Sequence, residues 1–259
     1  MIPRALTIAT SDSGGGAGIQ ADLKAFAAAG VYGTSALVAL TAQSTTAVTA
    51  VHELPPDFIR AQLEAIFDDI GVDAAKTGML FSRTIIETVA EFLERRSVTL
   101  VVDPVLIASS GAQLLQDDAV ETLIQRLFPL AAVVTPNLPE AETLTDLPGA
   151  SRRDVAERLV ELGAAAAVVT GGHGDPPVDH LFDGHEHVEL PVERHPVAAT
   201  HGAGCTHSAT LAALLARGLP LVGAARGASA AASAAVRNGL VEIGAGDGPV
   251  DVLNVKGRA

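Results

Sequence analysis

The segment with the most direct chemical potential is a glycine-rich stretch that contains the chain's single cysteine, Cys205. It reads Thr-His-Gly-Ala-Gly-Cys-Thr over residues 200–206, and it leads into a predicted helix over 204–215. The start of a helix presents unpaired N–H groups and the positive end of the helix dipole, so it can bind an anion. The residues whose N–H groups would form such an anion hole are Gly202, Ala203 and Gly204.

Cys205 would sit in the same field, which lowers the pKa of a thiol and makes it a candidate base. The spacing fits a second interpretation equally well, namely a glycine-rich start to a helix with a buried, inert cysteine. The two interpretations stay open at this level.

A second glycine-rich segment, residues 10–22, follows the first predicted strand and opens the first predicted helix. It does not fit a dinucleotide-binding fingerprint, because Ile19 stands where the last glycine would be needed and no acidic residue ends a second strand. A turn that admits a small planar ligand, with Asp22 as a polar contact, is one interpretation. Taken alone, the pattern favours a simple turn with an Asp that complements the helix dipole.

Carboxylates and an amide follow two other predicted strands. Asn137 and Glu140 are three residues apart and share a face of the first turn of a helix, where they could hold a hydrated Mg²⁺. The same pair also fits a capping box, which is the simpler interpretation of the spacing. Asp103, directly before Pro104, is either a turn residue or a carboxylate near metal and phosphate.

Two further side chains suit a flat heterocycle. The amide of Gln43 offers both a donor and an acceptor to the edge of a pyrimidine. Met79 offers an adaptable apolar wall. Taken alone, each residue is more often an ordinary loop or core residue. The eight histidines show no spacing typical of metal ligands.

Short β-branched runs alternate with longer amphipathic runs, which predicts an α/β fold with a mainly parallel sheet and helices on both faces. We expect the 259 residues to form a single domain, 1–259. Ligands bind beyond the carboxyl ends of the strands in such sheets. The predicted strands span 5–9, 34–41, 48–54 (an edge strand), 74–77, 100–102, 132–135 and 165–170, with an edge β-hairpin at 180–183 and 187–190. The predicted helices span 17–29, 57–69, 82–96, 117–128, 138–145, 152–162, 204–215 and 222–241.

The composition excludes several function classes. A net charge of −13 disfavours contact with nucleic acid and with anionic lipid, and 3% aromatic residues leave little for base stacking. No apolar stretch approaches the length of a membrane span, and the first residues do not resemble a signal peptide. One cysteine allows no intramolecular disulfide, which fits a reducing, cytoplasmic location.

The segments together are more specific than any one of them, and the chain resembles the hydroxymethylpyrimidine/phosphomethylpyrimidine kinases of thiamine biosynthesis, a branch of the ribokinase superfamily. The resemblance runs nearly end to end. It is carried by residues 5–9, Asp12, 15–24, 41–43, 76–79, 103–105, 135–141, 171–173, 200–202, 204–206 and 248–251.

The resemblance implies a ribokinase-like three-layer α/β/α fold around a sheet of eight or nine strands, and it implies roles for particular residues. The pyrimidine would be contacted or enclosed by Gln43, Asp22, Met79, Ala17 and Val105. ATP and Mg²⁺ would be held by Asp103, Asn137, Glu140 and Thr170, with Asp103 and Glu140 reaching the metal through water. The residues 202–204 would form the anion hole, and Cys205 would be the base for the substrate hydroxyl. Homodimers are usual in the family.

Four residues depart from the family pattern: Thr10 stands where Gly is usual, Ser109 and Thr170 stand where Lys is common, and Ala203 replaces a Thr. The loss of two Lys weakens the expectation for the second step, phosphorylation of the monophosphate, more than for the first. Lys76 is the remaining candidate phosphate contact among the strand ends. The alternatives are a pyridoxal or pyridoxamine kinase of the same superfamily and a non-catalytic vitamin-binding domain.

Overall fold

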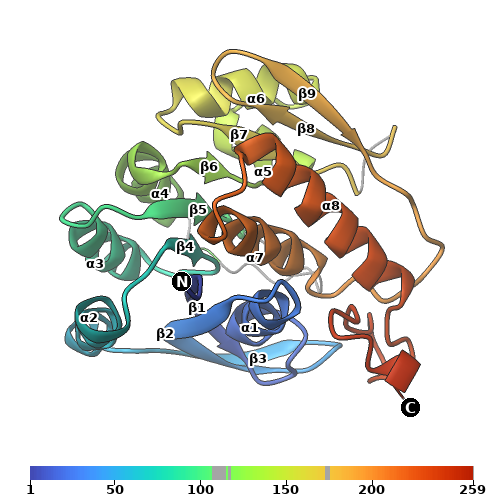
Figure 1. The fold of residues 1–259 in the computed structure, drawn as a ribbon, viewed down its shortest axis with the longest axis horizontal. Helices are drawn as coiled ribbons and strands as arrows, with labels where there is room; N and C mark the ends of the chain where they lie inside the picture. Colours follow the sequence, from blue (N-terminus) through green and yellow to red (C-terminus); the bar gives the residue numbers. More distant parts are fainter. Residues whose placement is uncertain (107–114, 116–117, 173–175, 259) are drawn as a thin grey trace.

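The computed structural model describes residues 1–106, 115, 118–172 and 176–258. Nine strands form one sheet in the order β3-β2-β1-β4-β5-β6-β7-β8-β9 (Figure 1). The strands are β1 (Arg4–Asp12), β2 (Tyr32–Gln43), β3 (Val48–Glu53), β4 (Ala74–Thr77), β5 (Thr99–Val102), β6 (Val133–Val134), β7 (Ala167–Val169), β8 (Val178–Phe182) and β9 (His187–Pro191).

Helices connect these strands and cover both faces of the sheet. They are α1 (Gly18–Ala28), α2 (Pro56–Ala65), α3 (Arg83–Leu93), α4 (Ala119–Leu127), α5 (Leu138–Thr145), α6 (Arg152–Glu161), α7 (Ala203–Ala216) and α8 (Leu221–Arg237). A π-helical turn over Ile66–Ile70 extends α2, and short 3₁₀ turns occupy Phe128–Leu130 and Lys256–Arg258.

Six neighbouring strands, from β2 through β1 and β4 to β7, run parallel. Their carboxyl ends therefore meet at one edge of the sheet. The remaining strands pair antiparallel: β3 closes one side of the sheet, and the hairpin of β8 and β9 closes the other. The parallel sheet with an edge hairpin expected from the sequence is therefore confirmed.

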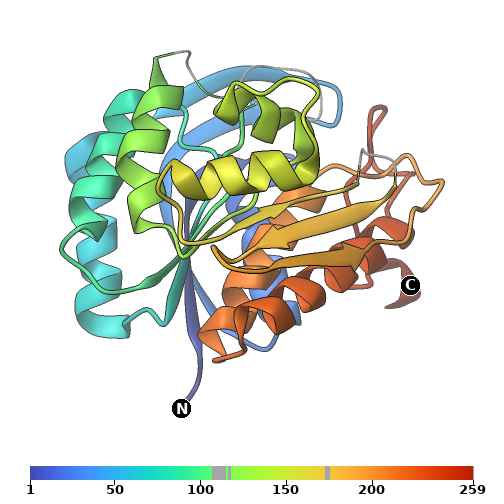
Figure 2. The same cartoon turned by 90° about the horizontal axis from the view of Figure 1, so that it is seen from above.

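The core divides into two clusters, one on each face of the sheet, because successive side chains of a strand point to opposite faces. In β5, Leu100 and Val102 belong to the cluster under α2 to α6, while Val101 belongs to the cluster under α1, α7 and α8. The two groups of helices lie on opposite sides of the sheet in Figure 2. This confirms the three-layer arrangement.

The ends of several elements differ from the sequence-based prediction. The last helix was predicted over 222–241, but α8 ends at Arg237. The chain turns there, with the N–H of Gly239 bonded to the carbonyl of Val236, and Leu240 then donates its N–H to Pro249. A contact between Leu240 and Pro249, nine residues further along the chain, cannot be predicted from helical periodicity. Within the described residues, no helix is both long and apolar enough to span a bilayer.

The packing of α1 gives a first testable prediction. Phe26 is fully buried between α1 and the start of β2, where Gly33 leaves room for its ring. Phe26→Ala should lower the free energy of unfolding by about 3–5 kcal/mol, because it removes a large buried side chain and leaves a cavity. Urea unfolding measures the difference. The matched control is Phe58→Ala on α2, which is 57% exposed and should change stability by less than about 0.5 kcal/mol; equal losses in the two variants would contradict this packing.

Candidate active site

The glycine-rich loop before α7 has the geometry that an anion hole needs, with one correction. Gly202 is the residue before the helix and has a φ of +86°, which only glycine adopts without strain. The N–H of Ala203 is already bonded to the carbonyl of Thr200, so it is not free for a ligand as the sequence interpretation supposed. Gly204 and Cys205 lie in the first helical turn, where N–H groups have no partner inside the helix. Together with Gly202, these two residues remain the candidate N–H donors for an anion.

A second loop, between β1 and α1, is held against this one by Asp12. Its carboxylate accepts hydrogen bonds from the N–H groups of Gly14, Gly16 and Ala17, at 2.7, 3.0 and 2.8 Å. It also lies 3.1 Å from Nε2 of His201, the residue that precedes the anion-hole glycine. Burial opposes the charge on Asp12, but the bonds from His201, Ala17 and Gly14 outweigh it and lower the pKa of this carboxyl. Asp12 is therefore a charged junction between the two loops.

The same junction involves the end of the chain. The backbone of His201 pairs with the segment around Pro249: its N–H bonds to the carbonyl of Gly248, and its carbonyl accepts the N–H of Val250. Gly202 packs so closely that a Cβ atom there would overlap the carbonyl oxygen of Gly16. Three distant segments thus fix the position of the anion-hole loop.

A buried charge cluster lies under the two loops. Nζ of Lys76, at the end of β4, is 3.1 Å from both carboxylate oxygens of Asp22 and 3.5 Å from Asp103. The hydroxyl of Thr7 donates to Asp22 at 2.6 Å, and that of Ser208, on α7, donates to Asp103 at 2.7 Å. The carboxylates raise the pKa of the Lys76 ammonium above its ordinary value even though burial opposes the charge. Lys76 therefore stays positive.

This cluster changes two expectations. The side chain of Lys76 is 0% exposed, so it has no surface to offer a phosphate. The carboxylate of Asp22 is equally enclosed, with both oxygens bonded to protein groups, which corrects the prediction of a direct pyrimidine contact. Asp22 instead sets the position of Lys76 beneath the site.

Cys205 lies next to this cluster, and the expected drop in its thiol pKa is wrong. Although part of the residue is exposed, burial of the thiol raises its pKa to about 12, and the nearby carboxylates of Asp22 and Asp103 add to the rise. The ammonium of Lys76 and the N–H of Gly18, at the start of α1, oppose it only in part. Burial and the two negative charges therefore outweigh the ammonium of Lys76 and the N–H group of Gly18.

Asn137 and Glu140 form the capping box that was the simpler interpretation of their spacing. Each side chain accepts a hydrogen bond from the backbone N–H of the other residue, at 3.0 and 2.9 Å, and so fixes the start of α5. Burial and the charge of Asp103 raise the pKa of Glu140 to about 8. Two carboxyl groups that repel each other in this way form a site that a cation would stabilise.

The structure therefore fits Mg²⁺ at Asp103 and Glu140, although it provides no complete cage. Within the described ranges, no group of three or more His, Cys, Asp or Glu residues is arranged to hold a metal. Mg²⁺ keeps several waters and binds one or two carboxylates together with substrate phosphates, so two carboxylates suffice.

The predicted ring contacts lie around the same strand ends. Gln43 ends β2, and its backbone is bonded to Ser13 in the loop between β1 and α1. Met79 is buried directly after β4, and its carbonyl accepts both the N–H and the hydroxyl of Thr10. Thr10, a departure from the family pattern, thus ties β1 to the Met79 segment. Ala17 is half-buried and bonded to Asp12 as described above.

The remaining predicted residues are placed as follows. Val105 is half-buried two residues after Asp103, and its N–H bonds to the carbonyl of Asp103. Thr170 pairs with Asn137 where β6 and β7 end. Ser109 and His173 lie outside the described residues.

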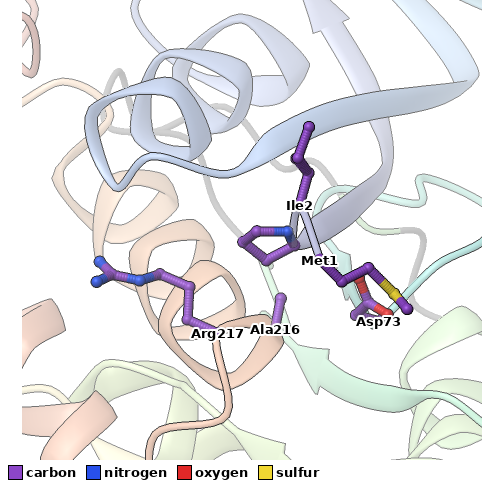
Figure 3. Close-up of a pocket in the computed structure, with 6 residues that line it drawn as sticks. Met1, Ile2, Asp73, Ala216 and Arg217 are labelled. Atoms are coloured by element: carbon purple, nitrogen blue, oxygen red, sulfur yellow. The ribbon is translucent and has the colours of Figure 1, made fainter.

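A separate hollow has a volume of about 330 Å³, and Figure 3 shows the residues that line it. Met1, Ile2 and Pro3 line it together with Asp73, just before β4, and Arg217, just after α7. It lies at the amino ends of the parallel strands, and no predicted site residue lines it. The catalytic interpretation therefore applies to the opposite edge of the sheet.

Sequence reasoning missed the pairing of Lys76 with Asp22 and that of Asp12 with His201. All four residues stand in the segments that carried the resemblance, so they were visible as candidates. The pairs themselves span 54 and 189 positions of the chain, and no local pattern indicates such partners.

Comparisons with known proteins identify the family of the chain. A family model described as phosphomethylpyrimidine kinase matches residues 12–251. A hydroxymethylpyrimidine/phosphomethylpyrimidine kinase of Rhizobium meliloti is 49% identical, with 95% of each chain covered. A pyridoxal kinase of Bacillus subtilis, solved as an ADP complex, has a TM-score of 0.90 and 37% identity, with 99% of each chain covered. A phosphomethylpyrimidine kinase structure from Clostridium difficile has a TM-score of 0.79 and 41% identity, over 89% of this chain and 97% of that one.

The fold is ribokinase-like, and the fold and site together define a phosphotransferase that uses ATP. Within that class, the chain belongs to the phosphomethylpyrimidine kinase family.

The raised thiol pKa gives a labelling prediction. With a pKa of about 12 against an ordinary 9.0, native Cys205 should react with iodoacetamide on the order of a thousandfold more slowly than an unperturbed thiol near pH 8. Its rate should still rise tenfold per pH unit through pH 10, whereas the urea-unfolded chain should level off above pH 9. Mass spectrometry of the single cysteine measures both rates. A native rate that levels off near neutral pH would show that the helix field dominates after all.

The close approach at Gly202 gives a stability prediction. Gly202→Ala should lower the free energy of unfolding by about 1–3 kcal/mol, because the residue is held at positive φ against the carbonyl of Gly16. Gly204→Ala is the matched control, since a Cβ atom there meets nothing within 4 Å. Thermal and urea unfolding of the two variants compare them. If both alanines are tolerated alike, the two loops do not pack as described.

Proposed function

We propose that this chain transfers the γ-phosphoryl group of ATP to the hydroxymethyl group of 4-amino-5-hydroxymethyl-2-methylpyrimidine, and then phosphorylates the resulting monophosphate, as a step of thiamine biosynthesis. One observation carries the proposal: Cys205, at the start of α7, lies beside the Lys76–Asp22–Asp103 cluster at the carboxyl edge of the sheet. The family match gives this arrangement its substrate class.

The chemistry follows from positioning and charge. Phosphoryl transfer asks the protein mainly to align the reacting groups and to stabilise charge on the moving phosphoryl group. The N–H groups of Gly204 and Cys205 and the dipole of α7 would supply that stabilisation. A bound Mg²⁺, held by Asp103 and Glu140 through water, would neutralise charge on the ATP phosphates.

Cys205 would accept the proton of the substrate hydroxyl. Its thiol is protonated at neutral pH in the unliganded structure, so it cannot be a standing thiolate base there. A loose transition state needs proton removal only late in the reaction. Neutralisation of the carboxylate charges that raise the pKa of Cys205 would favour the thiolate at that stage.

The second phosphorylation needs a cation for the extra phosphate of the monophosphate. Lys76 is enclosed and paired with carboxylates, so it does not fill that role. The dipole and N–H groups of α7 are then the main groups that offset the negative charge of the extra phosphate. This predicts a higher KM for the monophosphate than for the alcohol.

Pyridoxal is the second candidate substrate, favoured by one observation: the Bacillus subtilis pyridoxal kinase matches this fold with a TM-score of 0.90. No comparison favours a non-catalytic domain. A single domain over residues 1–259, a homodimer and a cytoplasmic location stay predictions.

The test is a coupled ADP-release assay with Mg-ATP and three acceptors: hydroxymethylpyrimidine, its monophosphate and pyridoxal. Turnover of both pyrimidines is expected, and turnover of pyridoxal alone would replace the proposal by the second candidate. Cys205→Ala should lower kcat about a hundredfold or more, as the loss of a positioned base does. The kcat of Cys205→Ser, which keeps a proton acceptor, should fall less. Full turnover by the Cys205→Ala variant would contradict the role assigned to Cys205.

A further inference from the structure

Asp179, the second residue of β8, carries a buried carboxylate that the proposed reaction does not use. The residue is 4% exposed. Its Oδ1 accepts the N–H of Gly171, just after β7, at 2.6 Å, and its Oδ2 accepts the hydroxyl of Ser229, on α8, at 2.5 Å. A Cβ atom at Gly171 would overlap the carbonyl oxygen of Val178, so β7 and β8 also meet directly at this point. The carboxylate therefore joins the end of β7 to the start of β8 and to α8.

A third contact of Asp179 comes from α7. Nε2 of His207 lies 3.5 Å from Oδ2 of Asp179, and the residue is only 3% exposed. Within the part of the chain that the structure describes, neither ring nitrogen of His207 makes a hydrogen bond. The next residue of α7, Ser208, donates its hydroxyl to Asp103. Two successive residues near the start of α7 thus each face a carboxylate at the carboxyl edge of the sheet.

Asp179 stays charged in this enclosed position. Burial opposes the charge, but the contacts with His207, Ser229 and Gly171 outweigh it and lower the pKa of the carboxyl group. A hydrogen bond to a charged acceptor is about twice as strong as a bond between neutral groups. The bond from Gly171 therefore fixes the segment after β7 more firmly than a neutral acceptor would.

This segment contains one of the predicted ATP contacts. Thr170 directly precedes Gly171, and its N–H bonds to the carbonyl of Pro136 at 2.9 Å. Its backbone pairs with that of Asn137, another predicted ATP contact. Asp179 thus sets where these two predicted contacts lie relative to α7.

We propose that Asp179 is a positioning residue for the nucleotide, because its bond to Gly171 holds Thr170 in a fixed place relative to the start of α7. This inference rests on the proposed function, in which Thr170 contacts ATP and the start of α7 stabilises the transferred phosphoryl group. A contact that is already in place needs no ordering when the ligand binds. Loss of the bond should weaken the binding of ATP and leave the binding of the acceptor nearly unchanged, because the predicted ring contacts lie on other segments.

The experiment compares Asp179→Ala, which removes the acceptor, with Asp179→Asn, whose amide oxygen can still accept the N–H of Gly171. Ser229→Ala is the matched control, since it removes a bond to the same carboxylate and leaves the bond from Gly171 in place. Calorimetry gives the Kd of Mg–AMP-PCP, an ATP analogue that cannot transfer its phosphoryl group. Steady-state kinetics give KM for ATP and for the hydroxymethylpyrimidine acceptor.

Asp179→Ala should raise the Kd of the analogue and the KM for ATP about tenfold, as expected for one lost hydrogen bond to a charged group. The KM for the acceptor should stay nearly unchanged. Asp179→Asn should show a smaller rise, and Ser229→Ala should keep the wild-type values. The loss of a negative charge near ATP would by itself strengthen the binding of this anion, so a weakening reports on position rather than on charge.

Thermal unfolding of the three variants separates positioning from folding. If nucleotide binding weakens in Ser229→Ala as much as in the Asp179 variants, Asp179 acts only on stability and the inference is overturned. Unchanged or tighter binding of the analogue by Asp179→Ala overturns it as well. If Asp179→Ala does not fold, Asp179→Asn must still bind the analogue more weakly than Ser229→Ala does. A failure of the proposed function is distinguishable, because the wild-type protein would then bind the analogue without phosphorylating the pyrimidine.

Discussion

The carboxylates of Asp22 and Asp103 and the ammonium of Lys76 form a buried cluster from which water is excluded. The positions of the surrounding loops depend on this cluster. Lys76 comes from β4, Asp22 from α1, and Asp103 follows β5. Removal of one member of such a buried cluster leaves an uncompensated charge, which typically costs about 3–5 kcal/mol. The cluster therefore holds α1 and two strands in one fixed relation beneath the reacting groups.

The start of α7 explains how an acidic protein can handle ATP. The net charge of −13 gives no general attraction for nucleotides. The favourable potential is local, since it comes from the N–H groups and the dipole at the start of α7, whereas the charge of the enclosed Lys76 is taken up by Asp22 and Asp103. The same local balance keeps the thiol of Cys205 protonated, because two carboxylates outweigh one ammonium and one N–H group. The reactivity of the Cys205 thiol therefore depends on how many of the neighbouring carboxylates keep an unneutralised negative charge.

Much of the fold could be predicted from the sequence, because alternating apolar runs report directly on which face of a strand is buried. Leu100, Val101 and Val102 divide between two cores as their alternation requires. Gly202 could be singled out because a tight loop before a helix needs a residue free of Cβ. The direction of the Cys205 pKa shift could not be predicted, since it depends on the burial of the thiol and on charges from α1 and from the end of β5. Asp22 was predicted to contact the ligand because a carboxylate at this position could do so. The structure shows that its carboxylate is enclosed and paired with Lys76 instead.

The junction at His201 has a consequence for synthesis of the protein. A ribosome releases the chain from its N-terminus, and early segments begin to fold while later ones are still being made. Asp12 must wait for a partner 189 positions away, and the backbone of His201 must wait longer still for Gly248 and Val250. The nascent sheet can therefore assemble while its carboxyl edge is unfinished, and the loop before α7 reaches its folded position only after residues 248–250 have left the exit tunnel.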